Sequence, residues 1–289
     1  MTRHWGIAEE ETSAFVQQEL IKTIMVKKVD HSVFEFEGQP SSCNQRTGYP
    51  KSGTPNERPR SQRILDGQDR PGSSHAAEAS GAVRGSLWNG AFVVMGSSTG
   101  GVEALEIILS ELPVRCPPVL ITQHMPERFL RKLANRLDQR LGPEVRLVDQ
   151  VMPLEPGRIY IGSGGDHHLA VGHRAGKVLA GPVEGPTRNG HRPSVDVLFR
   201  SARPFASRVV GVVLTGMGCD GASELLELRE AGAQTIAESQ KTALVYGMPK
   251  AAIENGAAAH ILPRDRIAAR MLDLCKSANQ RDYSGKLHQ

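Results

Sequence analysis

Three side chains of this sequence, a serine, a histidine and an aspartate, have the chemistry for acyl transfer. Ser98, His124 and Asp220 each come shortly after an apolar run, and these runs are AFVVMG, PVLIT and RVVGVVLT. In an open α/β sheet, ligands bind at the carboxyl ends of the strands. A serine hydroxyl is a weak nucleophile that needs a neighbouring base, and a histidine base needs an acid to orient it. The three residues are therefore a candidate nucleophile, base and orienting acid.

The serine lies in a glycine-rich turn, GSSTGG (96–101), which has the form G-x-S-x-G. This form presents the serine between a strand and a helix, whose first N–H groups can stabilise negative charge. A nucleotide-binding glycine loop would suit the turn equally well. However, the G-x-G-x-x-G spacing is not met, and the next strand ends in Gln123-His124 rather than in the acidic residue that binds a ribose. Together with His124 and Asp220, the turn favours catalysis.

The other two residues also have ordinary structural interpretations. A histidine at the end of a strand is more often structural than catalytic, although its charge changes near neutral pH, which suits a general base. Asp220 lies in TGMGCDGA (215–222) and is also suited to cap a helix that begins near Gly221. These two roles of Asp220 are compatible. The candidate donors to an oxyanion are the backbone N–H groups of Thr99 and Met217.

Two further polar stretches contain candidate ligand-binding residues. The stretch GGDHH (164–168) holds candidate metal ligands. Adjacent histidines on an extended chain point to opposite sides, so we expect no metal site there. Arg192 lies in a polar loop that enters a helix beginning near Pro193 or Ser194. It is a candidate for binding a polar or anionic substrate segment, whereas a solvated surface arginine is the commoner outcome.

The segments that position these residues alternate between strand and helix patterns. Strands are expected over 91–96, 118–125, 158–162, 208–217 and 233–238, and helices over 102–112, 127–141 and 221–232. This alternation predicts an α/β fold with a doubly wound, mainly parallel sheet and helices on both faces. Apolar residues make up 39% of the chain and aromatic residues only 4%, which is typical of a core built from Val, Ile, Leu and Ala.

Composition divides the 289 residues into three segments. Residues 1–88 are predicted to form an N-terminal extension, with a short amphipathic helix over 8–28 and a flexible linker over about 41–86, which is rich in Ser, Gly, Pro and Arg. Residues 89–276 are expected to form the catalytic domain, and residues 277–289 a flexible tail.

Charge and cysteine content argue against several classes of protein. The net charge is only +4, from 35 basic and 31 acidic residues, and few aromatics are present to stack on bases, so nucleic-acid binding is not expected. The four cysteines have no spacing typical of a zinc site. The first 25 residues contain neither a secretory signal nor a continuous apolar span. We therefore expect a cytoplasmic protein that does not insert into a membrane.

From Ala91 to the 270s, the chain resembles the catalytic domain of chemotaxis protein-glutamate methylesterases. The matching stretches, in order, are MGSSTGGVEAL, ITQHMP, PLEPGRIYIGSGGDHH, HRPSVDVLF, GVVLTGMGCDGA, AGAQTIAE and YGMPKAA. The resemblance implies that Ser98 is the nucleophile, His124 the base and Asp220 the orienting acid. It also supports the N–H groups of Thr99 and Met217 as oxyanion donors.

This resemblance implies hydrolysis of glutamyl methyl esters on the cytoplasmic helices of methyl-accepting chemotaxis receptors. Methanol would be released without a cofactor, and some relatives also deamidate glutamines of the receptors. The alternative is a catalytically silent receptor-binding module of the same fold, but retention of all three chemical groups argues against it.

Members of this family commonly carry an N-terminal receiver domain, which this sequence is not expected to contain. Only about 88 residues precede the catalytic domain, and Asp30, Asp66 and Asp69 show no phosphoacceptor pattern. Control by phosphorylation is therefore not expected.

Overall fold

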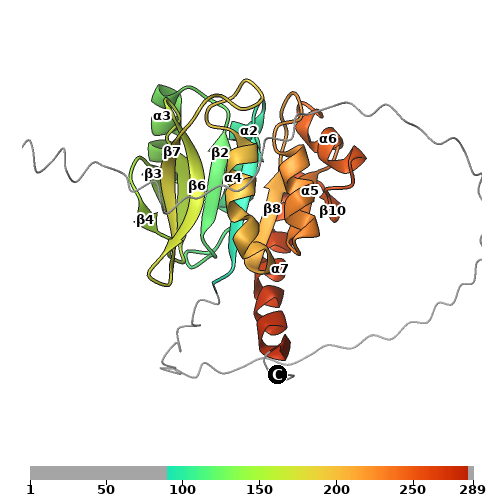
Figure 1. Ribbon diagram of the computed structural model, residues 1–289. Helices are drawn as coiled ribbons and strands as arrows, with labels where there is room; N and C mark the ends of the chain where they lie inside the picture. Colours follow the sequence, from blue (N-terminus) through green and yellow to red (C-terminus); the bar gives the residue numbers. More distant parts are fainter. Residues whose placement is uncertain (1–89, 286–289) are drawn as a thin grey trace, which may run out of the picture. The chain divides into compact units, whose positions relative to one another are not determined.

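The computed structural model describes residues 90–285 (Figure 1). The helix predicted over 8–28 and the linker predicted over 41–86 lie outside these residues. The described part of the chain contains a large sheet with helices on both faces and a smaller second sheet.

Seven strands form one parallel sheet, which confirms the predicted α/β fold. In their order across the sheet, they are β10 (His260–Leu262), β9 (Gln234–Glu238), β8 (Val209–Val213), β1 (Phe92–Ser97), β2 (Val119–Gln123), β5 (Arg158–Gly162) and β3 (Glu144–Val148). The chain builds the sheet from β1 toward β3 and later from β8 toward β10, so the strand order reverses between β1 and β8. In doubly wound sheets, such a reversal opens a crevice outside the carboxyl ends of the strands.

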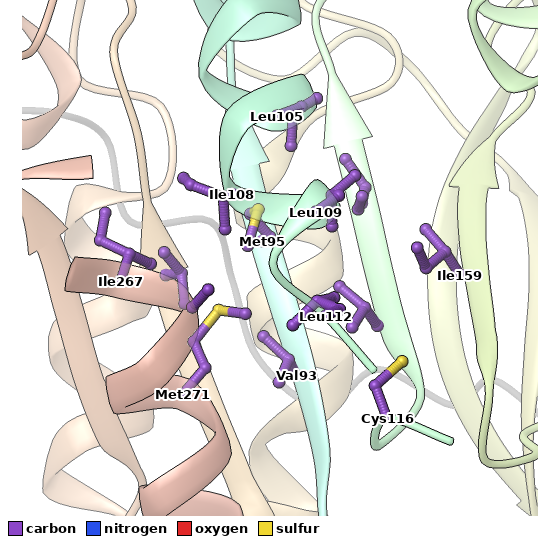
Figure 2. Close-up of a cluster of buried hydrophobic side chains, with 14 of the residues drawn as sticks. Val93, Met95, Leu105, Ile108, Leu109, Leu112, Cys116, Ile159, Ile267 and Met271 are labelled. Carbon is purple, nitrogen blue, oxygen red and sulfur yellow. The ribbon is translucent and has the colours of Figure 1, made fainter. Parts of the chain in front are cut away.

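Helices cover both faces of the large sheet. One face carries α2 (Gly101–Ser110), α3 (Glu127–Asp138) and α7 (Arg264–Gly285), and the other carries α4 (Val195–Ala202), α5 (Ala222–Glu230) and α6 (Met248–Glu254). The 3-10 helix η2 (Arg203–Arg208) follows α4. Successive side chains of β1 alternate between the two core layers, as the pleat of a strand requires. Figure 2 shows Val93 and Met95 in the first layer, beside Ile108 of α2 and Met271 of α7.

A second, antiparallel sheet was not predicted from the sequence. Its strands are β4 (Met152–Pro153), β7 (Lys177–Glu184) and β6 (His167–Arg174). A tight turn joins β6 to β7 through Ala175 and Gly176, whose φ angles are 50° and 75°. Positive φ at both central residues is typical of a hairpin turn, but an alanine rarely adopts it and so does not signal one. The hairpin is attached to α4, because the N–H of Val171 donates to Oγ of Ser201 at 2.9 Å.

Helix α7 extends beyond the predicted end of the catalytic domain. It runs to Gly285, so residues 277–285 are helical where a flexible tail was predicted. The segment SANQRDYS (277–284) contains no proline, and the cost of helix nucleation has already been met by the preceding turns. Within the described residues, no helix is both long and apolar enough to cross a membrane.

Candidate active site

The three residues expected to act together follow neighbouring strands. Ser98 comes directly after β1 and His124 directly after β2, while Asp220 lies in the loop between β8 and α5. Strand β1 pairs with both β2 and β8, and all three strands run in the same direction. The three residues therefore lie at the carboxyl edge of the sheet, at the point where the strand order reverses.

Ser98 is held in a tight turn between β1 and α2. Its N–H donates to the carbonyl oxygen of Thr215 at 3.0 Å, which ties the turn to the loop after β8. Gly100, the N-cap of α2, has a φ of 81°, a left-handed conformation that favours glycine. At Gly101 a β-carbon would lie 2.2 Å from Oε1 of Gln123. The glycines thus allow close packing beneath the turn, while Ser98 itself remains partly exposed.

His124 and Asp220 form a direct hydrogen bond. The distance between Nε2 of His124 and Oδ2 of Asp220 is 2.8 Å, and both side chains are at least 95% buried. The other ring nitrogen of His124, Nδ1, is also buried and has no hydrogen-bond partner among the described residues. Nδ1 is therefore available to exchange a proton with a third group.

Several donors surround the carboxylate of Asp220. The hydroxyl of Ser194 donates to Oδ1 at 2.9 Å, the N–H of Val195 donates to Oδ2 at 2.7 Å, and the amide of Asn189 donates to Oδ1 at 2.9 Å. Burial alone would raise the pKa of Asp220, but the hydrogen bond and charge of His124, together with the donors of Val195 and Asn189, hold that pKa below its usual range. The site therefore favours a charged carboxylate next to the imidazole.

Asp220 does not cap the helix that follows it. The N-cap of α5 is Gly221, which has no side-chain capping bond. Asp220 instead accepts the N–H of Val195 at the start of α4, where the positive end of a helix dipole stabilises an anion. The cap expected for α5 is thus replaced by a cap on α4, because the tertiary fold brings the two helix starts together.

A second imidazole lies against His124. The rings of His124 and His191 are stacked, with centroids 3.7 Å apart and an interplanar angle of 10°. Burial, and next the charge of His124, lower the pKa of His191 below its ordinary value. His191 thus lies against one face of the His124 ring, and its own ring is favoured in the neutral form.

The two backbone donors expected for an oxyanion lie on the turn and on the glycine loop. Thr99 follows Ser98, and Met217 belongs to the loop that ends at Asp220. The two parts are adjacent, since a β-carbon on Gly216 would lie 2.7 Å from the β-carbon of Ser98. Within residues 90–285, neither the Thr99 N–H nor the Met217 N–H donates to a protein acceptor. Both donors are therefore available to a bound ligand.

The sequence of this region matches a known protein family. Residues 93–271 match the family model described as CheB methylesterase. The chain belongs to the CheB methylesterase family. The match includes every residue of the candidate site.

Individual relatives agree with this assignment. The protein-glutamate methylesterase/protein-glutamine glutaminase of Gluconobacter oxydans is 48% identical over 197 residues, which cover 67% of this chain and 56% of that protein. The protein of the same name from Agrobacterium fabrum is 47% identical over 183 residues, covering 63% of this chain and 52% of that protein. The chain thus spans about half the length of the curated relatives it matches.

A solved structure shows the same fold. The crystal structure of the Thermotoga maritima CheB methylesterase catalytic domain superimposes with a TM-score of 0.62 and 37% sequence identity. The match covers 98% of that chain and 64% of this one. The described part of this chain therefore has the fold of a CheB catalytic domain.

Arg192, the predicted substrate-binding residue, donates to three protein groups. Its Nε bonds to the carbonyl of Gly165 at 2.7 Å, one terminal nitrogen bonds to the carbonyl of Gly185 at 2.9 Å, and the other bonds to Asp166. The arginine thus joins two loops of the CheB fold. Its side chain remains 28% exposed, and the guanidinium group has donors beyond these three bonds.

The two adjacent histidines considered as metal ligands point to opposite sides of β6. His168 is buried, with Nδ1 accepting the N–H of Ser194 at 3.1 Å and Nε2 lying 3.0 Å from the carbonyl of Pro186. His167 lies on the other face, where its Nε2 is 3.9 Å from Oε1 of Glu184. His168 therefore supports the start of α4, the helix that Asp220 caps.

Four residues near the candidate CheB triad were not predicted as site residues: Asn189, His191, Ser194 and Asp196. All four belong to the polar stretch NGHRPSVD (189–196), in which only Arg192 was predicted to be a site residue. The available signal was the density of polar groups just before a helix. The sequence did not indicate which of these side chains turn toward Asp220 and His124.

Proposed function

We propose that the protein is a serine hydrolase that removes methyl groups from glutamyl esters of methyl-accepting chemotaxis receptors. Its relatives from Gluconobacter oxydans and Agrobacterium fabrum carry the name protein-glutamate methylesterase/protein-glutamine glutaminase. That name supports deamidation of receptor glutamines as a related activity, because esters and amides are attacked through the same acyl chemistry. The substrate segments would be the cytoplasmic helices of the receptors, which makes the cytoplasm the place of action.

One observation carries this proposal: the 2.8 Å hydrogen bond between His124 and Asp220 at the edge where β1 presents Ser98. In the proposed mechanism, Ser98 is the nucleophile, His124 the general base and Asp220 the acid that orients the imidazole. Because Nε2 of His124 is bonded to Asp220, Nδ1 would receive the serine proton.

The proposed reaction has two halves, neither of which needs a cofactor. The Ser98 oxygen attacks the ester carbonyl carbon, and the oxyanion accepts hydrogen bonds from the N–H groups of Thr99 and Met217. The bond from the carbonyl carbon to the methoxy oxygen then breaks, and Nδ1 of His124 returns its proton to give methanol. A water molecule, deprotonated by the same nitrogen, attacks the acyl-enzyme and releases a glutamate side chain and the serine hydroxyl.

Arg192 is proposed to bind a polar or anionic part of the receptor segment. Its remaining donors and partial exposure support this role, and its bonds to Gly165 and Gly185 would keep the guanidinium in place.

The experiment that tests the proposed function measures methanol release from methylated receptor. Ser98→Ala should reduce the rate by about 10⁴-fold or more, the scale seen when a triad nucleophile is removed. Ser110→Ala is the matched control, because this exposed serine at the end of α2 donates, among residues 90–285, to the carbonyl of Ile107 in its own helix. Ammonia release from a glutamine-containing receptor measures deamidation in the same samples. A parent protein that binds receptor but releases neither product would instead support the silent binding module.

A further inference from the structure

Helices α4 and α5 begin side by side, and a carboxylate at the start of each one accepts a backbone N–H from the start of the other. Asp220, just before α5, accepts the N–H of Val195 in α4 at 2.7 Å. Asp196, in the first turn of α4, accepts the N–H of Gly221, the N-cap of α5, at 2.8 Å. Each helix start is thus capped by an acid from the other. This exchange fixes the position of Asp220 relative to both helices.

The side chain of Asn189 bridges the same two acids. Its amide nitrogen lies 2.6 Å from Oδ2 of Asp196 and 2.9 Å from Oδ1 of Asp220. An amide nitrogen carries two hydrogens, so one Asn can donate to both carboxyl groups at once. The amide of Asn189 therefore links the two acids in one hydrogen-bond network next to His124.

A tight backbone turn between Arg188 and His191 positions the side-chain amide of Asn189. The N–H and carbonyl groups of Arg188 and His191 pair with each other at 3.0 and 2.8 Å, and Asn189 has a φ of 50°. Asparagine tolerates this left-handed conformation better than most residues. The same turn carries His191, whose ring stacks on His124. One short turn therefore contacts both the acid and the base of the proposed triad.

Burial of both carboxyl groups makes it unfavourable for Asp196 and Asp220 to be ionised together. Asp196 is 8% exposed and Asp220 only 1%. Burial, followed by the charge of Asp220, raises the pKa of Asp196 to about 7, whereas the pKa of Asp220 is held below its usual value. Glu224 of α5 also faces Asp196 and is itself paired with Arg200 of α4, at 2.9 Å between Oε1 and Nε. Up to neutral pH, the negative charge of the acid pair is therefore concentrated on Asp220, the partner of His124.

We propose that Asn189 and Asp196 are positioning residues of the catalytic centre, which hold the Asp220 carboxylate against His124 through the amide bridge and the exchanged helix caps. The inference rests on the proposed function only for the reaction that this centre performs. The network itself can be tested in a protein that shows no turnover.

The test removes the amide without disturbing the turn. Asn189→Gly keeps the left-handed backbone, because glycine adopts positive φ without strain. Asn189→Asp keeps the shape of the side chain but places a third carboxyl group against two others. Ala175→Gly is the matched control, since Ala175 has the same φ of 50° in the β6–β7 turn and takes no part in the network.

The first readout is the titration of the Asp196 carboxyl group, followed by NMR in protein labelled with ¹³C-aspartate. The signal is assigned by its loss in Asp196→Asn. The hydrogen bond from Asn189 lowers the pKa of Asp196, so Asn189→Gly should move this titration to higher pH. Asn189→Asp should move it further in the same direction, and Ala175→Gly should leave it at the parent position.

The second readout is kcat and KM for methyl-ester hydrolysis. Loss of a hydrogen bond to a charged group should lower kcat of Asn189→Gly by about tenfold, with little change in KM. An unchanged Asp196 titration in both Asn189 variants would overturn the inference. A shifted titration with parent-like kcat would also overturn it, because the network would then not act on the reaction. If the parent releases no methanol but the titration shifts as expected, the network stands and the proposed function fails.

Discussion

The Nε2 atom of His124 lies 2.8 Å from Oδ2 of Asp220, which leaves Nδ1 as the ring nitrogen that faces no protein acceptor or donor within residues 90–285. In the serine protease arrangement, the acid holds Nδ1 and the base is Nε2. Here the imidazole has the opposite orientation. Asp220 therefore selects the tautomer with a proton on Nε2 and a lone pair on Nδ1.

Asp220→Asn tests this selection. An amide in place of the carboxylate can present a donor to Nε2, which favours the wrong tautomer, and it no longer stabilises the imidazolium. We expect kcat for methanol release to fall by about 10³–10⁴-fold, as when the acid of a triad is neutralised. Asp149→Asn is the control, because the carboxyl group of Asp149 is exposed and lies 4.0 Å from the guanidinium of Arg131, at the limit of an ion pair. Equal loss of activity in both variants would contradict the assigned role.

A positive charge at position 191 should influence the pH dependence of activity, because the side chain there stacks on His124. Activity is expected to rise with pH, because only a neutral imidazole accepts the serine proton. His191→Lys places a positive charge beside His124, favours its neutral form, and should move the rise to lower pH. His191→Phe keeps an aromatic ring without a charge and should leave the midpoint near that of the parent.

These pH profiles are measured as initial rates of ester hydrolysis at constant ionic strength. Identical midpoints for His191→Lys and His191→Phe would show that a charge at position 191 does not act electrostatically on His124. A flat profile for the parent would count against His124 as the base.

Asp196 should make the protein less stable as the pH rises. Its folded-state pKa of about 7 exceeds the value of about 3.9 for an aspartate in an unfolded chain. Between these values the folded state binds more protons than the unfolded state, so the free energy of unfolding decreases as pH increases. Asp196→Asn cannot ionise and should gain about 2–4 kcal/mol relative to the parent between pH 5 and pH 8.

Urea unfolding at several pH values measures this difference. The control Asp149→Asn, an exposed site, should follow the parent across the range. If Asp196→Asn also follows the parent, the carboxyl group of Asp196 does not retain its proton in the folded state.

Gly96→Ala tests the packing beneath the turn that carries Ser98. A β-carbon at Gly96 would lie 2.2 Å from Cγ1 of Val195, the residue whose N–H binds Asp220. Both positions are buried, so the clash should reduce the free energy of unfolding by about 1–3 kcal/mol. Adding Val195→Ala removes the clashing methyl groups and should recover part of the loss. A double-mutant cycle with no coupling between the two sites would contradict this packing.

The framework of the site could be predicted from the order of residues along the chain. Runs of β-branched residues separated by glycine turns and helix patterns indicated parallel strands, and they placed Ser98, His124 and Asp220 after three of those strands. Strand β5 was predicted with the bounds it has, because RIYIG is short, apolar and clearly delimited. These features could be predicted because they depend on residues close together in the chain.

The contacts between these groups, in contrast, depend on how distant segments of the chain pack together. The acidic side chain of Asp220 is suited to cap the helix beside it, yet the fold pairs it with α4, which begins 25 residues earlier. The antiparallel sheet, the stacked ring of His191 and the bridge from Asn189 likewise depend on contacts between segments distant in sequence. Local chemistry shows that a carboxylate or an amide needs partners, but only the packing of helices and loops around the sheet determines which partners are within reach.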